Sequence, residues 1–375
     1  MSKAPKLRFP EFEGEWEEKE LAEISESESS SLSLNKLNLV EEGYAVYGAD
    51  GEVGLINNYD QKNKYIAIIK DGSGVGKIFL YKGKTSVLAT LSYLKSRNKI
   101  VLEWLYYLLQ TIDLKSYVKG SGIPHIYFSD YSRQLIYKPQ EEEQQKIADC
   151  LSALDEQIAA EEEALEALKA YKKGLLQQLF PQEVSNNYPP PLTFSKLPKL
   201  RFAGFEGEWE EVKLGEICNI TNGKANVQDH IEGGRYPLFD RSEVVKASNE
   251  YFLDCETVIL PGEGIRFTPK YYKGKFNLHQ RAYALKDFSC SGLFLSYAIY
   301  AKKDLLATKA VQSTVLSLRL PILQNFEICI PVDIAEQEKI ANCLSSLDEL
   351  IETKNEKIKL LKSYKKGLLQ QMFVN

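Results

Sequence analysis

At 375 residues the chain is longer than a single hydrophobic core usually supports, so two or more domains are expected. Its 44% hydrophobic and 26% charged residues are ordinary for a soluble globular protein, and no apolar run approaches the ~18 residues of a membrane span. The net charge of −5 argues against a generally basic nucleic-acid-binding protein.

The N-terminal sequence MSKAPKLRFPEFEGEWEE lacks an apolar stretch, so no secretory signal is expected there. The six cysteines form no CxxC pair, and the three histidines lie far apart in the sequence. No metal site is therefore predicted, and we expect free thiols in a reducing cytoplasm.

Two segments of the chain each occur in two similar copies. The opener PKLRFPEFEGEWEEKELAEI, residues 5–24, matches the second opener, residues 198–217, at 15 of 20 positions. Farther along, residues 147–180 match 340–373 at 21 of 34 positions, and both pairs share an offset of 193 residues. These repeats predict a scaffold, here called the frame, that is present in two copies.

The segments enclosed by the repeats, here called the inserts, are residues 25–135 and 218–327. They have nearly equal lengths but no clear similarity. A duplicated gene that drifted is the alternative explanation, but drift alone would erode frame and inserts alike. We therefore predict one scaffold that carries two different recognition modules.

The first insert is predicted to be a mixed α/β module. Residues 43–56 indicate two strands around an Asp50-Gly51 turn, and residues 64–81 indicate a second pair around a Gly-rich turn. The apolar run 99–118 predicts a buried helix. Strands followed by a helix are predicted in the same order in the second insert, at 256–267, 279–287 and 292–308.

The repeated segments 147–180 and 340–373 are predicted to be long helices of roughly 50 Å, each with one narrow apolar stripe. The stripe residues recur at spacings of three, four and seven: Ile147, Leu151, Leu154, Ile158, Leu165 and Leu168, then Ile340, Leu344, Leu347, Ile351, Ile358 and Leu361. Such a stripe must be buried against a partner, and the other copy is the obvious one, so a coiled coil is predicted.

Charged residues interrupt the two stripes at equivalent places, first at Glu161 and Lys354, then at Lys172 and Lys365. The opposite signs of Glu161 and Lys354 suit helices that associate with each other, although two solvated charges are the alternative. The five prolines of residues 181–198 indicate an extended linker.

The predicted order of domains follows from these segments: first recognition domain 1–135, first spacer helix 136–180, Pro-rich linker 181–197, second recognition domain 198–327 and second spacer helix 328–375.

Positive charge is concentrated in the inserts. The first has 13 Lys+Arg against 11 Asp+Glu, and the second has 14 against 11, whereas residues 136–180 have 5 against 10. This distribution favours inserts that approach phosphates and a frame that does not, although an excess this small can arise by chance.

Basic residues beside aromatic residues and turns are the candidate DNA contacts. The segment 264–281 carries Arg266, Lys270, Lys273, Lys275 and Arg281, with Tyr271 and Tyr272 between them. In the first insert, the Gly-rich segment YVKGSGIPHI places Lys119, Ser121 and His125 on a loop after the predicted helix. Backbone N–H groups and lysines can meet phosphates there, and arginine can read guanine edges. Solvated surface loops are the alternative.

No catalytic motif is present in the sequence. The segments DGSGVGK and KGKTSV suggest a phosphate loop, but the required glycine is replaced by Ile78. There is also no Ser-His-Asp pattern in a suitable local context, and no paired histidine ligands. The chain is therefore predicted not to be an enzyme by itself, so catalysis would have to come from partners.

The layout resembles the specificity subunit of type I restriction–modification systems over nearly the full length. The resemblance rests on the twice-written PKLRF..FEGEWEE opener, the helices that end in YKKGLLQQ.F, and the Pro139–Ile147 and Pro331–Ile340 segments that lead into the helices. The segment KGSGIPHI also resembles a loop that closes recognition domains in this family. The second insert lacks it and has ATKAVQSTVLSLRLPIL instead.

The resemblance implies an α+β fold with two mixed α/β target recognition domains separated by two long antiparallel coiled-coil helices, as a pseudo-twofold internal repeat. Each domain would read one half of a bipartite, asymmetric site in double-stranded DNA. Two methylation subunits would dock on this chain, and restriction subunits can join. S-adenosylmethionine, ATP and Mg²⁺ would belong to those partners, with no cofactor in this chain.

A second hypothesis is a scaffold or assembly protein whose paired modules bind proteins instead of DNA. Co-purification with a methyltransferase, together with salt-sensitive retention on heparin, would discriminate between the two. The bases that are read and the length of the DNA spacer do not follow from the sequence.

Overall fold

The computed structural model describes residues 3–181, 183–184, 193–194, 197–312 and 315–374. The chain divides into two compact units. Unit 1 consists of Met1–Glu163 and Asn355–Asn375, and unit 2 consists of Ala164–Lys354. Both boundaries fall inside the long helices α4 (Glu141–Leu179) and α9 (Ile334–Met372). Each unit therefore contains one opener, one insert and part of both long helices.

The insert of unit 1 forms a four-stranded antiparallel sheet in the order β2-β8-β5-β6. A three-stranded sheet has the order β4-β3-β7, and its β3–β7 pair is parallel. The strands are β2 (Ser25–Ser29), β3 (Tyr44–Gly48), β4 (Gly51–Ile56), β5 (Tyr65–Ile69), β6 (Ile78–Tyr81), β7 (Ser86–Val87) and β8 (Leu91–Ser96). The predicted hairpins at 43–56 and 64–81 are confirmed as β3–β4 and β5–β6.

The insert of unit 2 forms a six-stranded sheet in the order β13-β18-β16-β17-β14-β15. Its strands are β13 (Asn219–Asn222), β14 (Tyr236–Phe239), β15 (Lys246–Ser248), β16 (Leu253–Pro261), β17 (Lys270–Leu278) and β18 (Ala282–Lys286). The run β13-β18-β16-β17 repeats the order β2-β8-β5-β6, and β14 pairs in parallel with β17 as β3 does with β7. The prediction of one architecture for two dissimilar inserts is confirmed.

One buried helix packs on each sheet, α2 (Leu102–Thr111) in unit 1 and α6 (Gly292–Ala301) in unit 2. Trp104 of α2 and Phe294 of α6 are fully buried in the apolar cores of their units. The predicted helix at 99–118 is shorter than expected, because the Asp113 side chain accepts a hydrogen bond from Lys115 N and begins a separate 3₁₀ turn.

Short elements complete the two openers and the two inserts. They are α1 (Leu21–Ile24), η1 (Leu34–Lys36), η2 (Leu114–Tyr117), α3 (Phe128–Tyr131), α5 (Leu214–Ile217), η3 (Val227–Asp229), α7 (Lys303–Lys309), β19 (Val311–Gln312), β20 (Leu316–Ser317) and α8 (Leu320–Gln324). Most of the linker predicted at 181–197 lies outside the described residues. Within it, β10 (Glu183–Val184) pairs antiparallel with β11 (Thr193–Phe194).

The frame closes each insert with a two-stranded ribbon. In unit 1, β1 (Glu17–Glu20) of the opener pairs antiparallel with β9 (Leu135–Lys138), which leads into α4. In unit 2, β12 (Glu210–Lys213) pairs in the same way with β21 (Glu327–Ile330), which leads into α9. The start and the end of each insert therefore lie side by side on the frame.

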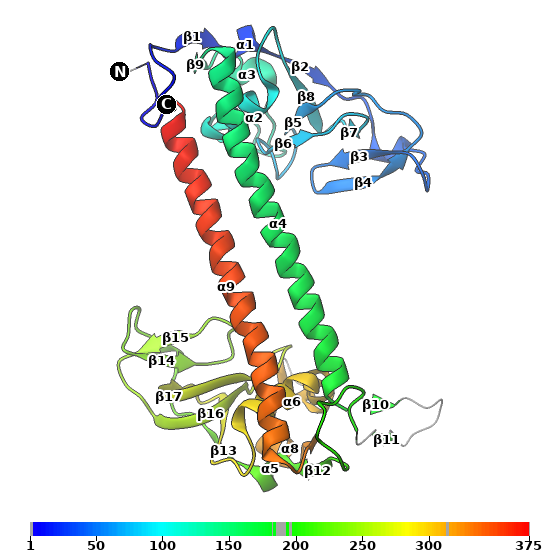
Figure 1. Ribbon diagram of the computed structural model, residues 1–375, viewed down its shortest axis with the longest axis vertical. Coiled ribbons are helices and arrows are strands. Elements are labelled where there is room, and N and C mark those ends of the chain that lie inside the picture. Colours follow the sequence, from blue (N-terminus) through cyan, green and yellow to red (C-terminus); the bar gives the residue numbers. More distant parts are fainter. Residues whose placement is uncertain (1–2, 182, 185–192, 195–196, 313–314, 375) are drawn as a thin grey trace. The chain divides into compact units, whose positions relative to one another are not determined.

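The long helices contain 39 residues each and begin six residues before the predicted 147 and 340. The extra turn has few apolar residues, but its acidic residues suit a helix N-terminus. In unit 1 the helices run antiparallel, because Asp155 pairs with Lys365 while Glu161, farther along α4, pairs with Lys357. Figure 1 shows the C-terminal part of α9, in red, beside the first half of α4.

The predicted helix–helix interface residues differ in burial. Eight of them are buried: Ile147, Leu151, Leu154, Ile158, Leu165, Ile340, Leu344 and Ile358. Four are half-buried: Leu168, Leu347, Ile351 and Leu361. In unit 1, Leu151 and Ile158 of α4 share an apolar cluster with Leu368 and Met372 of α9. The ion pair of Glu161 is made with Lys357 at 2.6 Å, one turn from Lys354.

A buried carboxylate joins the opener to the long helix in each unit. In unit 1, Arg8 Nε and Nη2 each donate to one oxygen of Glu143 at 2.8 Å, and Trp16 Nε1 donates to the same carboxylate at 3.2 Å. In unit 2, Arg201 makes the same two bonds to Glu336 at 2.8 Å. The two carboxylate side chains are only 2% and 1% exposed. Because each long helix needs this contact with an opener, the opener sequence occurs in both copies of the frame.

Replacing Arg8 by Ala should destabilise unit 1 by on the order of 3 kcal/mol, because Glu143 would remain buried without its charged partner. We place the loss at the lower end for buried ion pairs, since Arg8 itself lies partly at the surface. Urea unfolding of the full chain measures the shift in the midpoint. Arg133→Ala, which removes an exposed arginine of the same unit, is the control and should change little. Equal midpoints for both variants would contradict this role of Arg8.

Candidate nucleic-acid interface

In unit 1, the turn between β5 and β6 lies against a short hairpin that follows α2. Gly72 N donates to Pro124 O at 2.9 Å, and Ile126 N donates to Lys70 O at 2.8 Å. Within the hairpin, Lys119 and His125 exchange two backbone hydrogen bonds of 2.8 Å. The predicted contact residues of the first insert thus lie on one edge of the module.

The side chains on this edge leave polar groups accessible. Lys119 Nζ lies 2.5 Å from Asp130, and this hydrogen bond lowers the pKa of the Asp130 carboxyl. Ser121 is exposed near the tip of the hairpin, and the His125 ring is 5.3 Å from the Tyr127 ring. Gly120 has φ +92°, and a Cβ there would lie 2.6 Å from Ile123 O, so the tight turn requires glycine.

Unit 2 has a corresponding edge, built from a different sequence. Gly264 N, in the turn between β16 and β17, donates to Leu316 O at 3.0 Å, and Leu318 N donates to Gly262 O at 2.8 Å. The contacting segment is the hairpin β19–β20, which follows α6 and α7. The second insert lacks the KGSGIPHI sequence, yet its fold places a hairpin against the same turn.

Two arginines gather around Glu263 on the edge of unit 2. Arg281 Nη1 lies 3.0 and 2.8 Å from the two oxygens of Glu263, and Arg241 Nη1 lies 3.6 Å from one of them. Both arginines remain more than half exposed. They line a cavity of about 240 Å³, whose lining also includes Asn226, Gln228, His279 and Gln280. Arginine can read guanine edges and asparagine or glutamine can read adenine edges, so this lining suits base recognition.

The predicted contact loop at 264–281 is in large part a strand, which corrects the sequence-based interpretation. Residues 270–278 form β17, in which the exposed Tyr271, Lys273 and Lys275 alternate with less exposed residues, and the strand pairs with β16 over residues 270–276. Lys270 is held against the segment that follows β14, where its Nζ donates to Ser242 O at 2.7 Å and to Glu243 O at 2.8 Å. Burial lowers the pKa of the Lys270 ammonium group.

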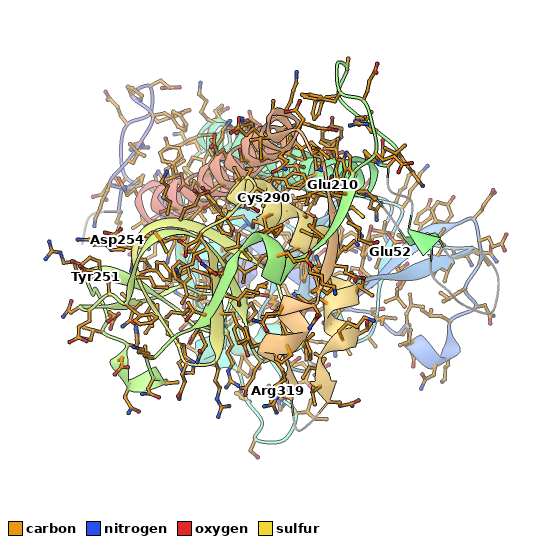
Figure 2. The ribbon with its side chains drawn as sticks, turned by 90° about the horizontal axis from the view of Figure 1, so that it is seen from below. Glu52, Glu210, Tyr251, Asp254, Cys290 and Arg319 are labelled. Atoms are coloured by element: carbon orange, nitrogen blue, oxygen red, sulfur yellow. The ribbon has the colours of Figure 1, made fainter. Side chains whose placement is uncertain are left out.

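The other basic residues of this segment are exposed but differ in position. Lys273 and Lys275 lie opposite Glu256 and Asp254 on the neighbouring strand. Figure 2 shows Asp254 on one side of unit 2 and Arg319, which directly follows the β19–β20 hairpin region, on another. Lys275 lies farther along β17 from the turn that forms the turn-and-hairpin edge than Lys273 does. Arg266 is close to that edge and 75% exposed, with Glu243 at 3.5 Å.

Sequence reasoning identified Arg281 but missed Arg241, Asn226, Gln228 and Gln280, which share its cavity. These residues come from three segments separated by strands β14 to β17, so no local pattern connects them. Arg241 and Gln280 lie just after strands β14 and β17, whereas Asn226 and Gln228 belong to the 3₁₀ turn η3 and its N-cap, so their proximity becomes clear only once the strand order is known.

Comparison with known protein families identifies the family of the chain that carries these two edges. The model of the type I restriction modification DNA specificity domain matches the chain twice, at residues 13–170 and 206–363. The chain belongs to this family. The two matched specificity domains each begin in an opener and end in a long helix, so they follow the repeat of the sequence.

Individual relatives agree with this assignment. The chain is 28% identical over 342 residues to the type I restriction enzyme MjaVIII specificity subunit of Methanocaldococcus jannaschii, covering 81% of this chain and 77% of that protein. It is 27% identical over 166 residues to the EcoDI specificity subunit of Escherichia coli, covering 43% of this chain and 37% of the relative. The S subunit of the type I system of M. genitalium has the same fold, with a TM-score of 0.75, 18% identity and 99% coverage of both chains.

Family membership bears on several predictions made from the sequence. The resemblance to specificity subunits is confirmed, as is the fold of two mixed α/β modules with long helices. The family is described by DNA specificity, which agrees with the prediction of a recognition subunit that is not itself an enzyme. The individual contact residues and the domain boundaries stay predictions.

Proposed function

We propose that this chain is the subunit that selects the DNA site for a type I restriction–modification complex, and that each module reads one half of a bipartite, asymmetric site. The observation that carries the proposal is the pair of equivalent turn-and-hairpin edges on two modules of one fold. The edges have the same backbone arrangement but different side chains, which suits two different half-sites.

The catalytic work would belong to partners. We propose that two methylation subunits dock on this specificity subunit, and that restriction subunits join them in the cytoplasm. S-adenosylmethionine, ATP and Mg²⁺ would be bound by those subunits. The long helices would connect the two readers and set the length of DNA between the half-sites.

Binding of the purified chain to duplex DNA, alone and with its co-expressed methylation subunit, tests this function. We expect retention on heparin that is lost with salt, co-purification of the methylation subunit, and preference for one bipartite sequence. A chain that captures other proteins but shows no DNA binding with the methylation subunit present would support the scaffold hypothesis instead.

The exposed lysines of β17 give a graded test of the phosphate contacts. Lys273→Ala with Lys275→Ala should weaken binding to all DNA sequences alike and lower the log–log salt slope by about one unit per lost contact. The control is Lys359→Ala with Lys366→Ala, which removes the same charge from exposed positions on α9. An unchanged slope in the β17 variant would remove this strand from the DNA-binding face.

A further inference from the structure

In unit 1, Lys365, a charged residue that interrupts the apolar stripe of α9, forms a triad with Asp155 and Tyr107. The Tyr107 hydroxyl donates to Asp155 Oδ2 at 2.9 Å, and Lys365 Nζ lies 2.6 Å from Asp155 Oδ1. The same ammonium group lies 5.2 Å from the centre of the Tyr107 ring. Tyr107 belongs to the first insert and Asp155 to α4, but Lys365 belongs to α9, in the second copy of the frame. The triad therefore joins an insert to both copies.

Unit 2 contains the same triad with the copies exchanged. The Tyr297 hydroxyl donates to Asp348 Oδ2 at 2.6 Å, and Lys172 forms an ion pair with the same carboxylate. Lys172 Nζ lies 5.3 Å from the centre of the Tyr297 ring. Here the aspartate comes from α9 and the lysine from α4. The first lysine of each YKKG segment thus reaches the module that belongs to the other copy.

A second contact fixes the start of the buried helix of each module, α2 in unit 1 and α6 in unit 2, on the frame. Gln144 Oε1 accepts a hydrogen bond from Val101 N at 3.0 Å, and Gln337 Oε1 accepts one from Ser291 N at 2.8 Å. Val101 and Ser291 are the N-cap residues of α2 and α6. The glutamines directly follow Glu143 and Glu336, which bind the opener arginines, so this contact lies at the base of the module.

The two contacts have the same spacing in both units. The tyrosine follows the N-cap residue by six positions in each insert, and the aspartate follows the glutamine by eleven positions in each long helix. Eleven residues are about three helical turns. Two fixed points at this separation determine how the module helix lies on the long helix, although the inserts themselves have no clear sequence similarity.

The burial of the lysines argues that packing alone does not explain them. The side chains of Lys365 and Lys172 are only 16% and 17% exposed, and they interrupt stripes that are otherwise apolar. A leucine would bury more apolar surface at these positions. The charge is instead used in hydrogen bonds to a carboxylate that also accepts from tyrosine, and such charge-assisted bonds are the stronger and more directional kind.

We propose that Lys365 and Lys172 are positioning residues, each of which fixes the orientation of the recognition module in the opposite copy of the repeat. Lys365 acts on the first module through Asp155 and Tyr107, and Lys172 acts on the second module. The consequence for DNA recognition rests on the proposed function, because a half-site at a set spacing can be read only by a module of fixed orientation. The contact itself does not depend on that function.

The test uses the full chain with single substitutions. Lys365→Met and Lys172→Met remove the charge while keeping an unbranched chain of similar length, and Lys365→Arg keeps the charge and the donors. Lys366→Met and Lys173→Met are matched controls, since these neighbours in the same YKKG segments are exposed. Tyr107→Phe removes only the hydroxyl from the other side of the triad.

Amide hydrogen exchange reports the orientation contact without DNA. Lys365→Met should speed exchange in α2 by about tenfold or more and leave α6 unchanged, while Lys172→Met should do the reverse. Lys365→Arg should restore slow exchange. Tyr107→Phe should resemble Lys365→Met, and the double variant should show less than the sum of the two effects, because both act through Asp155.

Binding to DNA duplexes with the native spacer, or with one base pair added or removed, reports the consequence. Lys365→Met should reduce the preference for the native spacer over the altered spacers about tenfold, and the Lys366→Met control should keep that preference. The proposal would be overturned if Lys365→Met changed exchange in α6, if Lys172→Met changed exchange in α2, or if either variant left both helices unchanged. If the unaltered chain with its methylation subunit binds no DNA, the proposed function fails, and the exchange experiment still decides the role of the lysines.

Discussion

Replacing residues 25–135 by the insert of another specificity subunit should change one half of the recognised DNA site and leave the other half as it was. The physical reason is that each insert begins and ends on the paired strands of its own ribbon, β1–β9 or β12–β21. The apolar core of that insert lies within a single unit. A new insert therefore brings its own reading edge without altering the other module.

Mapping of the methylated sites in cells that carry the hybrid chain and its methylation subunit measures this effect. The reciprocal replacement of residues 218–327 is the matched control and should change only the other half. The incoming insert should carry a tyrosine six residues after its helix N-cap, so that Asp155 or Asp348 keeps its partner. A change in both halves, or in neither, would show that the modules do not read independently.

A half-length chain, residues 1 to 190, should form a homodimer. In the full chain, unit 1 is completed by the end of α9, where Lys365 reaches Asp155 and Phe373 packs against Trp104 and Trp16. The first copy contains the equivalent Lys172 and Phe180 at the end of α4. A second half-chain can therefore supply every one of these contacts, and with the methylation subunit it should direct modification of a palindrome made from the first half-site.

The homodimer should be weaker than the intramolecular pairing in the full chain. Glu161 pairs with Lys357 at 2.6 Å in unit 1, and the residue equivalent to Lys357 in the first copy is Ala164. Ala164→Lys should restore this ion pair and strengthen the dimer by up to about 1 kcal/mol per pair, since Lys357 is half exposed. Ala167→Lys, at a neighbouring exposed position, is the control.

Sedimentation analysis measures the dimer, and site mapping identifies its DNA sequence. A half-chain that stays folded and monomeric would show that the helix ends do not complete the units as described. A dimer that modifies a site without palindromic symmetry would show that the inserts are not independent readers.

The sequence predicted the frame well because its signal is repeated. The two openers, the apolar stripes and the order of strands and helix in both inserts were all expected, and the structure contains them. The repeat also marked Lys172 and Lys365 as equivalent interruptions of the stripes. What they bind could not be predicted, because Tyr107 and Tyr297 lie in dissimilar inserts and come into register only through the fold.

The turn-and-hairpin edges were predicted less well, because their residues also come together only in the fold. Segment 264–281 has a high local density of basic and aromatic residues, yet half of it is strand β17, and Lys270 bonds to backbone carbonyls of Ser242 and Glu243. The cavity at Arg241 and Arg281 is assembled from several turns that only the sheet order brings together. Local composition indicates where charge lies along the chain, and not which face of the folded module carries it.

Genome-wide mapping of methylated adenines, with and without this chain, tests the central claim most directly. We expect one methylated motif that depends on the chain, with two specific halves of different sequence separated by a spacer of fixed length and no sequence preference. Loss of that motif on deletion of the chain, while all other methylation remains, is the predicted result. Unchanged methylation at every site, or a dependent motif with a single uninterrupted specific sequence, would contradict two separate readers on one frame.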